Sequence, residues 1–269
     1  MSIVSSGDVL DFLDNPSDTD MVIMLHNSVE QWVRQYCRRD FESTSYTKER
    51  YDGTGTTILT LRNYPVISVD RLAIGTQEVI KVCNTSEYTT ATVSVTSTGL
   101  RLVKDGDVDT TITFSSNTTM TAVVSAVNAL GSGWSAELLN DDYANYKSTE
   151  LLKMYGKNCI DSNWVDLLIP NTAEDDFVVY ENEGIIHYPA KFPIGHNNVI
   201  VDYTAGYSSG DMPKDLQLAI KITVKHMYQK RSEESFSASA FKTGDYSVNL
   251  LDMPSEVREI LSKYKRCLV

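Results

Sequence analysis

The chain has 269 residues, of which 42% are hydrophobic and 22% are charged, a composition that supplies a sizeable core and excludes global disorder. Its formal net charge of −12 at pH 7 argues against a surface that binds nucleic acid by neutralising phosphates, because such a surface needs clustered Lys and Arg. The acidity suits either simple solubility or a passage whose lining repels phosphate and so lets DNA slide.

The cysteines and the N-terminus indicate the compartment. Four cysteines lie far apart and form no C-x-x-C pair, so we expect neither a zinc site nor a disulfide framework but a reducing environment. The opening MSIVSSGDVLDFLDN lacks the basic and continuous apolar regions of a signal peptide, and no apolar run approaches the ~18 residues of a membrane span. We therefore expect a cytoplasmic protein without membrane association.

The first expected elements are a short helix over 8–13 and a long helix that begins after Asn15-Pro16 and ends near Arg38-Arg39. One apolar stripe at three- and four-residue spacing predicts the long helix. The stripe consists of Met21, Val22, Leu25, Val29, Trp32, Val33 and Tyr36. From 44 to about 82 the period changes to two, which predicts a meander of short antiparallel strands.

Between about 87 and 183 Thr, Ser, Val and Asn dominate, and the helical stripes disappear. Strands are expected in TVSVTST, GLRLVKD, TTITFSS and GWSAELL, and a helix is expected in TMTAVVSAVNAL. We interpret 87–183 as an inserted β-rich α+β domain. The predicted fold class is therefore α+β, with residues 1–86 and 184–269 forming one discontinuous, largely helical core with short antiparallel strands.

The last part of the chain contains strands in FVVYENEGIIHY and NNVIVDYTAGY, followed by two helices. The first helix runs from Pro213 to about Arg231, is apolar on most sides, and has Asp211 as a candidate cap. The Ser-rich segment 232–245 is interpreted as a flexible arm. Pro254 then opens the final helix.

A possible catalytic motif is the sequence GYSSG at 206–210, which matches the G-x-S-x-G nucleophile elbow. That elbow needs a helix directly after its serine, whereas here Asp211, Met212 and Pro213 intervene before the predicted helix. The remaining chain also leaves no room for the units that carry the acid and the base. We favour a Gly-rich turn, and an esterase-like hydrolase that uses Ser208 is the alternative.

Patterns for metals and nucleotides are weak. The four histidines show no metal-ligand spacing. Asp105, Asp107 and Asp109 repeat like the first ligands of a calcium loop, but Thr110 and Ser116 occupy the positions of its Gly and Glu. A hairpin turn at 105–106 explains the same residues, and no phosphate-binding loop occurs. We expect no catalytic, cofactor-binding or metal-binding residue.

Four blocks of sequence at the two ends remain to be explained. They read GDVLDFLDN…DTDMVIMLHNSVEQWVRQYCRRDFES, LRNYPVISVDRLAI, NNVIVDYTAGYSSGDMPKDLQLAIKITVKHMYQKR and GDYSVNLLDMPSEVREILSKYKR. In this order they resemble the head-tail adaptor (connector) proteins of tailed bacteriophages, and YTAGY followed by P-x-DL is the most specific feature. Segment 87–183 has no counterpart in that pattern.

The resemblance implies a non-enzymatic structural protein of the virion neck, assembled in the host cytoplasm. Such proteins form a ring, usually of twelve copies, that joins the portal protein to a tail or stopper protein. The ring lines the passage of double-stranded DNA without binding it specifically. For segment 87–183 an alternative role is a decoration or glycan-binding module on the virion exterior.

The resemblance also implies two sets of candidate contact residues. The final helix is expected to dock on the portal through Val257, Arg258, Ile260, Leu261, Lys263, Tyr264, Lys265 and Arg266. Ring or core packing is expected for Leu25, Val29, Trp32, Tyr36, Ile220, Met227 and Tyr228.

Overall fold

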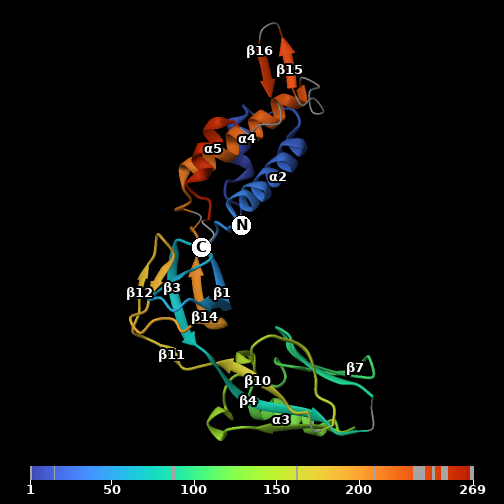
Figure 1. The fold of residues 1–269 in the computed structure, drawn as a ribbon. Helices are drawn as coiled ribbons and strands as arrows, with labels where there is room; N and C mark the ends of the chain where they lie inside the picture. Colours follow the sequence, from blue (N-terminus) through green and yellow to red (C-terminus); the bar gives the residue numbers. More distant parts are fainter. Residues whose placement is uncertain are drawn as a thin grey trace.

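The computed structural model describes residues 2–14, 16–86, 89–161, 163–208, 210–232, 240–243, 246–249 and 254–266. Figure 1 shows three parts in a row: a cluster of helices, a group of sheets, and a β-rich part formed by the middle of the sequence. The described ranges contain five α-helices and several antiparallel sheets, which confirms the predicted α+β class. No helix within these ranges is long and apolar enough to span a bilayer.

The helical cluster combines both ends of the chain. It consists of α1 (Ser6–Phe12), α2 (Thr19–Cys37), α4 (Lys214–Ser232) and α5 (Ser255–Ser262). Its fully buried residues include Val33 on α2, Leu216 and Ile220 on α4, and Val257 and Leu261 on α5. Each such side chain contributes about 1.5–3 kcal/mol when it is fully buried, so α5 is an integral part of this core.

Local capping explains where the first two helices begin and end. Ser5 Oγ accepts a hydrogen bond from Asp8 N at 3.0 Å, and Asp18 Oδ1 accepts one from Met21 N at 3.2 Å. Both side chains satisfy N–H groups that a helix start leaves without partners. Arg38, at φ 56°, adopts the left-handed conformation that ends α2. The two helices predicted here are confirmed.

The start of α4 differs in two details from the expectation. α4 begins at Lys214, and Gln217 N donates to Pro213 O at 3.1 Å, so Pro213 is the residue before the helix and not its first residue. Asp211 is not seen to cap the helix: its Oδ2 accepts from Ser208 Oγ at 2.5 Å within the preceding turn. Short polar side chains such as Ser and Asp often form local hydrogen bonds of this kind within a turn.

Part of the predicted arm 232–245 lies outside the described residues. Its first residue, Ser232, still belongs to α4. The described remainder forms strand β15 (Ala240–Thr243), which pairs antiparallel with β16 (Tyr246–Asn249). The described residues of the predicted arm are thus helical at Ser232 and paired strand at 240–243.

The central sheets lie next to the helical cluster in Figure 1. One sheet has the order β1-β14-β3-β11, formed by Thr44–Gly53, Gly195–Ala205, Val66–Ile74 and Ala173–Glu174. A smaller sheet has the order β12-β13-β2, formed by Val178–Tyr180, Ile185–His187 and Ile58–Thr60. Both sheets contribute to one core, which includes Leu61, Leu72, Ile186 and Tyr203.

The third part, called the insert below, has its own core. It comprises β4 (Thr76–Asn84), β5 (Ala91–Val95), β6 (Gly99–Lys104), β7 (Asp107–Thr113), α3 (Met120–Ala129), β8 (Trp134–Leu138), β9 (Met154–Asn158) and β10 (Val165–Pro170). Its sheets have the orders β10-β4-β8 and β7-β6-β5-β9. The four strands and one helix expected from sequence in this region are confirmed. The buried residues of this core extend from Val79 to Ile169.

The insert and the central sheets meet at a cluster of charged groups. Arg71 on β3 pairs with Glu150 of the insert at 2.6 Å and with Asp202 on β14 at 2.5 Å. Lys48 Nζ donates to the carbonyls of Thr149 and Leu151. These half-buried contacts hold the insert against the sheet, because they span two separate cores.

Candidate functional site

Arg39 occupies the boundary between the helical cluster and the central sheets. It is only 5% exposed. Its guanidinium carbon lies 3.8 Å from the ring centroid of Tyr64 and 5.1 Å from that of Phe41, and Nη2 donates to the Tyr64 carbonyl. A desolvated cation–π contact of this kind contributes about 2 kcal/mol. Arg39 therefore fastens the end of α2 to the loop that carries Tyr64.

The chain leaving β14 passes through the same place. Tyr207 N donates to Phe41 O at 2.7 Å, Ser43 N donates to Tyr207 O at 2.9 Å, and Gly206 N donates to Pro65 O at 2.8 Å. Gly206 has φ +112°, and a Cβ at this position would lie 2.3 Å from the carbonyl oxygen of Glu42. Only glycine fits such an approach without strain.

Residues that follow the final helix contact the same region. Tyr264 Oη donates to Asp215 Oδ1 at 2.6 Å, and its ring meets Phe41 edge-on with centroids 6.0 Å apart. Burial raises the pKa of the Tyr264 hydroxyl, and its hydrogen bond to Asp215 raises that pKa further. Arg266 N donates to Cys37 O at 2.9 Å. The end of α5 is thereby joined to the end of α2.

All four sequence blocks thus meet at one place, which we call the motif junction (Arg39, Phe41, Tyr64, Tyr207 and Tyr264). The sequence analysis identified the four motifs but did not predict that they contact one another. Burial raises the pKa of Tyr207, which lies beside Arg39. A half-buried, hydrogen-bonded aromatic cluster of this kind fixes orientation, so the motif junction sets the angle between the helical cluster and the central sheets.

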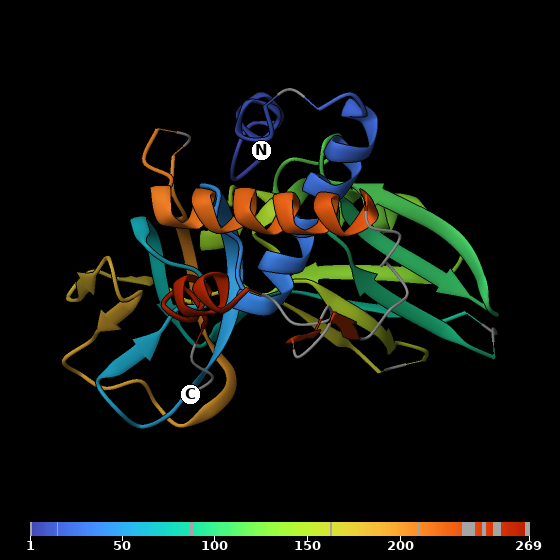
Figure 2. The same cartoon turned by 90° about the horizontal axis from the view of Figure 1, so that it is seen from above.

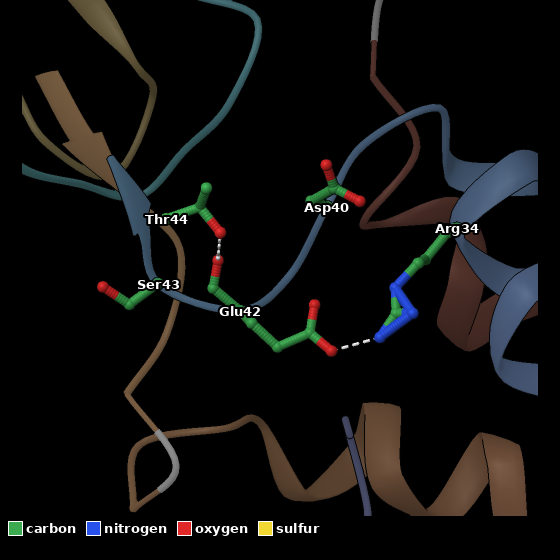
Figure 3. A pocket seen from close by; sticks show the side chains of 5 residues that line it. All are labelled: Arg34, Asp40, Glu42, Ser43 and Thr44. Carbon is green, nitrogen blue, oxygen red and sulfur yellow. Dashed lines mark hydrogen bonds and ion pairs between the residues drawn. The ribbon is translucent and has the colours of Figure 1, made fainter. Parts of the chain in front are cut away.

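An open depression lies beside the motif junction. It is lined by Arg34, Asp40, Glu42, Ser43 and Thr44 (Figure 3). Arg34 pairs with the Glu42 carboxylate and lies 3.6 Å from that of Glu30. Two carboxylates of the same chain therefore match its charge, and the pairing ties α2 to the segment before β1 rather than preparing an anion site.

Glu30 is a buried charge that sequence reasoning missed. It is 6% exposed, and its Oε1 accepts from Ser2 Oγ, Ile3 N and His26 Nε2 at 2.6, 2.7 and 3.2 Å. Burial alone raises the pKa of this carboxyl, but the hydrogen bonds from His26 and the N-terminal segment outweigh burial and hold the pKa below its ordinary value. The available signal was a His–Glu pair at i,i+4 within the apolar stripe of α2.

The residues expected to dock on a portal separate into two groups. Val257 and Leu261 are fully buried in the chain's own core, Ile260 is partly buried there, and Tyr264 belongs to the motif junction. The apolar face that was expected to meet a partner thus packs inside the chain. The exposed members are the basic residues Arg258, Lys263 and Lys265, with Arg266 half-buried. For these a docking role stays a prediction.

The residues expected in ring or core packing also separate. Those inside the helical core are Leu25, Val29 and Ile220. Those half-buried at its rim are Trp32, Tyr36, Met227 and Tyr228. Trp32 and Tyr36 stack with centroids 5.6 Å apart. A contact between copies stays a prediction for the rim residues.

The geometry around Ser208 differs from that of a hydrolase. Ser208 Oγ donates to Asp211 rather than facing a histidine, and α4 begins only at Lys214. His26 contacts Glu30, and His196 lies 2.9 Å from Asp52. In the described part of the chain, no three His, Cys, Asp or Glu side chains gather as metal ligands would. These contacts favour the turn interpretation of GYSSG.

One family model matches part of the chain. Residues 144–267 match the family model described as head completion protein. The matched segment includes β14, α4 and α5, which carry two of the four sequence blocks. The match confirms the predicted resemblance to connector proteins of the tailed-phage head and neck. The chain thus has the features of a structural protein of the phage virion.

Two solved structures are also similar to the chain at low identity. A chain from the neck of an empty gene transfer agent particle computed with C6 symmetry is 12% identical, with 97% of this chain and 90% of that chain covered and a TM-score of 0.38. A chain from the virion of a native gene transfer agent particle is 11% identical, with 99% and 91% covered and a TM-score of 0.35. No curated protein matches the chain.

Proposed function

We propose that the chain is a head completion protein of a tailed phage, a structural subunit of the neck that closes the filled head at the portal and receives a tail or stopper protein. The observation that carries this proposal is the family match over 144–267. It covers Tyr207, Asp215 and Tyr264, which hold α4 and α5 at the motif junction. Such a rigid, non-catalytic scaffold suits a part whose task is to hold other proteins.

The proposed assembly is a closed ring, of twelve copies by the resemblance, around the DNA passage. A heterologous interface that closes on itself yields such a ring without further machinery. The net charge of −12 supports passage of DNA without specific binding, because an acidic lining repels phosphate. The virion neck is the proposed location, with assembly in the host cytoplasm.

The proposed domain organisation is a discontinuous core interrupted by an insert. The insert was expected over 87–183; we propose about 76–170, since β4 pairs with β8 and β10 while β11 and β12 pair with strands of the central sheets. Its support is the separate buried core between Val79 and Ile169. The two ends of this core lie side by side, since Asn171 N donates to Gly75 O at 3.2 Å. An insert whose ends meet can be accepted by a host domain with little distortion.

Portal docking is proposed for the exposed basic residues Arg258 on α5 and Lys263 and Lys265 directly after it. With Val257 and Leu261 inside the core, the contact would be electrostatic and would need an acidic portal rim. Such contacts govern association rate and orientation more than affinity.

Deletion of the gene tests the proposed function. Heads that lack the protein should package DNA but lose it and remain tail-less, and the wild-type chain supplied in trans should restore tailed particles. An antibody against the chain should label the vertex between head and tail. The Ser208→Ala variant should restore particles as well as wild type does, since Ser208 has no catalytic part. Normal tailed particles without the gene would refute the proposal.

A further inference from the structure

Charge is segregated within the helical cluster. The first twenty residues contain five Asp and no Lys or Arg. α4, by contrast, contains four Lys and one Arg against one Asp. Such a separation inside a chain of net charge −12 creates two local fields of opposite sign, which orient approaching molecules.

The positive field comes from one face of α4. Lys214, Leu218, Lys221 and Lys225 recur at three- and four-residue spacing and therefore share a face. Lys214 is exposed, Lys221 is half-buried, and Leu218 is 43% exposed. Lys225 lies over the Phe12 ring at 5.3 Å. We call Lys214, Leu218 and Lys221 the basic stripe.

The negative field comes from the outer side of α1. Asp8 and Asp11 are exposed one turn apart, while Val9 between them is buried in the helical core. Asp14 follows, also exposed. We call Asp8, Asp11 and Asp14 the acidic edge. The side chain of Ser5 caps this helix, so none of the three carboxylates serves as its cap.

The two sets of charges do not neutralise each other within one molecule. Phe12 on α1 contacts Lys225 on α4, and Figure 2 shows the N-terminal helix on one side of α4 and α5 on the other side. Yet among the described residues no ion pair joins the acidic edge to the basic stripe. Both are available to a neighbour.

We propose that the basic stripe on α4 binds the acidic edge on α1 of a second copy of this chain, which makes the contact between subunits head-to-tail. The inference rests on the proposed function and specifies how copies meet in the ring. A head-to-tail contact uses two different surfaces of each copy, as a closed ring requires. It also removes repulsion at the contact between otherwise acidic molecules.

A second copy suits the basic stripe better than DNA does. Leu218 lies between Lys214 and Lys221 and is exposed, and an apolar side chain at the centre of a charged patch is typical of protein interfaces.

Crosslinking of assembled particles tests the contact directly. Necks containing a mixture of 15N-labelled and unlabelled chains are treated with a carbodiimide, which joins a lysine amine to a carboxylate, and are analysed by mass spectrometry. Mixed-label links from Lys214 or Lys221 to Asp8, Asp11 or Asp14 are expected. Links between copies that avoid both surfaces would overturn the inference while leaving the proposed function intact. Absence of the chain from necks would instead refute the proposed function.

Charge-reversed variants provide the second test. Lys214→Glu/Lys221→Glu and Asp8→Lys/Asp11→Lys should each reduce incorporation into particles at least about tenfold. Mixed together, the two variants should recover most of it, because each reversed surface then meets an opposite one. The control Lys147→Glu/Lys157→Glu makes the same charge change at exposed positions of the insert and should have no effect.

Two outcomes of the variant test would count against the proposal. Folding is checked by circular dichroism, and the mixing experiment keeps the test decisive, since a misfolded variant cannot be rescued by its partner. Failure of two folded variants to rescue each other would overturn the inference. In a further measurement, the binding of double-stranded DNA by the wild-type chain and by the Lys variant is compared by fluorescence anisotropy. Loss of DNA binding by the Lys variant, with its incorporation into particles unchanged, would assign the stripe to DNA instead.

Discussion

Tyr264, near the C-terminal end of the described chain, donates its hydroxyl to Asp215 on the first turn of α4 at 2.6 Å. Two motifs of the resemblance, P-x-DL and the closing tyrosine, are thus hydrogen-bond partners. Their contact joins α5 to α4 at the motif junction. The sequence alone presented them as separate signatures.

Replacing Tyr264 by Phe tests this bond. The ring would still pack on Phe41, but Asp215 would lose a charged-acceptor hydrogen bond, so the free energy of unfolding should fall by about 1–2 kcal/mol. Urea unfolding followed by circular dichroism measures the change. Tyr155→Phe is the matched control, because Tyr155 is 96% exposed and should change stability little. Equal effects of the two substitutions would show that the bond is not stabilising.

Gly206→Ala should be far more damaging than its size suggests. The new methyl group would lie 2.3 Å from Glu42 O at a backbone φ of +112°, and strain of this kind costs about 1–3 kcal/mol before any clash is relieved. Gly210→Ala is the control, since a Cβ there has no neighbour within 4 Å. Thermal melting should therefore separate the two alanine variants clearly; coincident melting curves would contradict the close approach.

The sequence predicted the elements well because each is marked by local periodicity. α2 follows from its apolar stripe, and the strands and α3 of the insert follow from their spacing between turns. The motif junction could not be predicted from the sequence, because Arg39 meets Tyr64 and Tyr207 only through tertiary packing. The sequence places Arg39 only near the end of the long helix, and its burial between two rings leaves no local signal.

The meander predicted over 44 to about 82 is wrong in its pairing, because β1 and β3 both pair with β14 instead of with a consecutive strand. β3 and β4 are consecutive strands with the same two-residue period, and only the structure shows that β3 pairs with β14 while β4 pairs with β8 and β10. The turn between them contains Gly75 at φ +85°. Composition changes only after β4, where polar loop residues begin, and so it cannot reveal a change of sheet inside the apolar pattern.

Glu30→Gln should weaken the pH dependence of the free energy of unfolding in the acid range. The pKa of Glu30 is below its ordinary value in the folded chain; a lowered folded-state pKa stabilises the fold above the unfolded pKa, and this contribution is lost as pH falls through the folded value. The variant should therefore lose stability at pH 7 and less at pH 3, as measured by urea unfolding across that range. Glu259→Gln, at an exposed position on α5, is the control. An equal loss at both pH values would contradict this linkage.

Removing the insert tests whether the core stands alone. Because Asn171 N bonds to Gly75 O at 3.2 Å, replacing residues 76–170 with a short Gly-Ser linker should leave the helical cluster and the central sheets folded. Removal of 87–183 instead deletes β11 and β12 and leaves β4 without β8 and β10. It should therefore fold less well. Cooperative melting of the first variant is the expected result, and a molten, aggregating product would show that the insert belongs to the core.

The final helix offers a way to separate stability from docking. Leu261 is fully buried, so Leu261→Ala should lower the free energy of unfolding by about 2–5 kcal/mol. Lys263 and Lys265 are exposed, and Lys263→Glu/Lys265→Glu should leave the melting temperature nearly unchanged while impairing attachment to portal-bearing heads. Lys265 Nζ also lies 5.1 Å from the Tyr36 ring centroid, so Lys263→Glu alone separates the loss of that contact from the loss of docking. Attachment is measured by sedimentation of the purified variants with DNA-filled heads. Normal attachment of the double variant would remove Lys263 and Lys265 from the portal contact and leave Arg258 as the remaining candidate of this group.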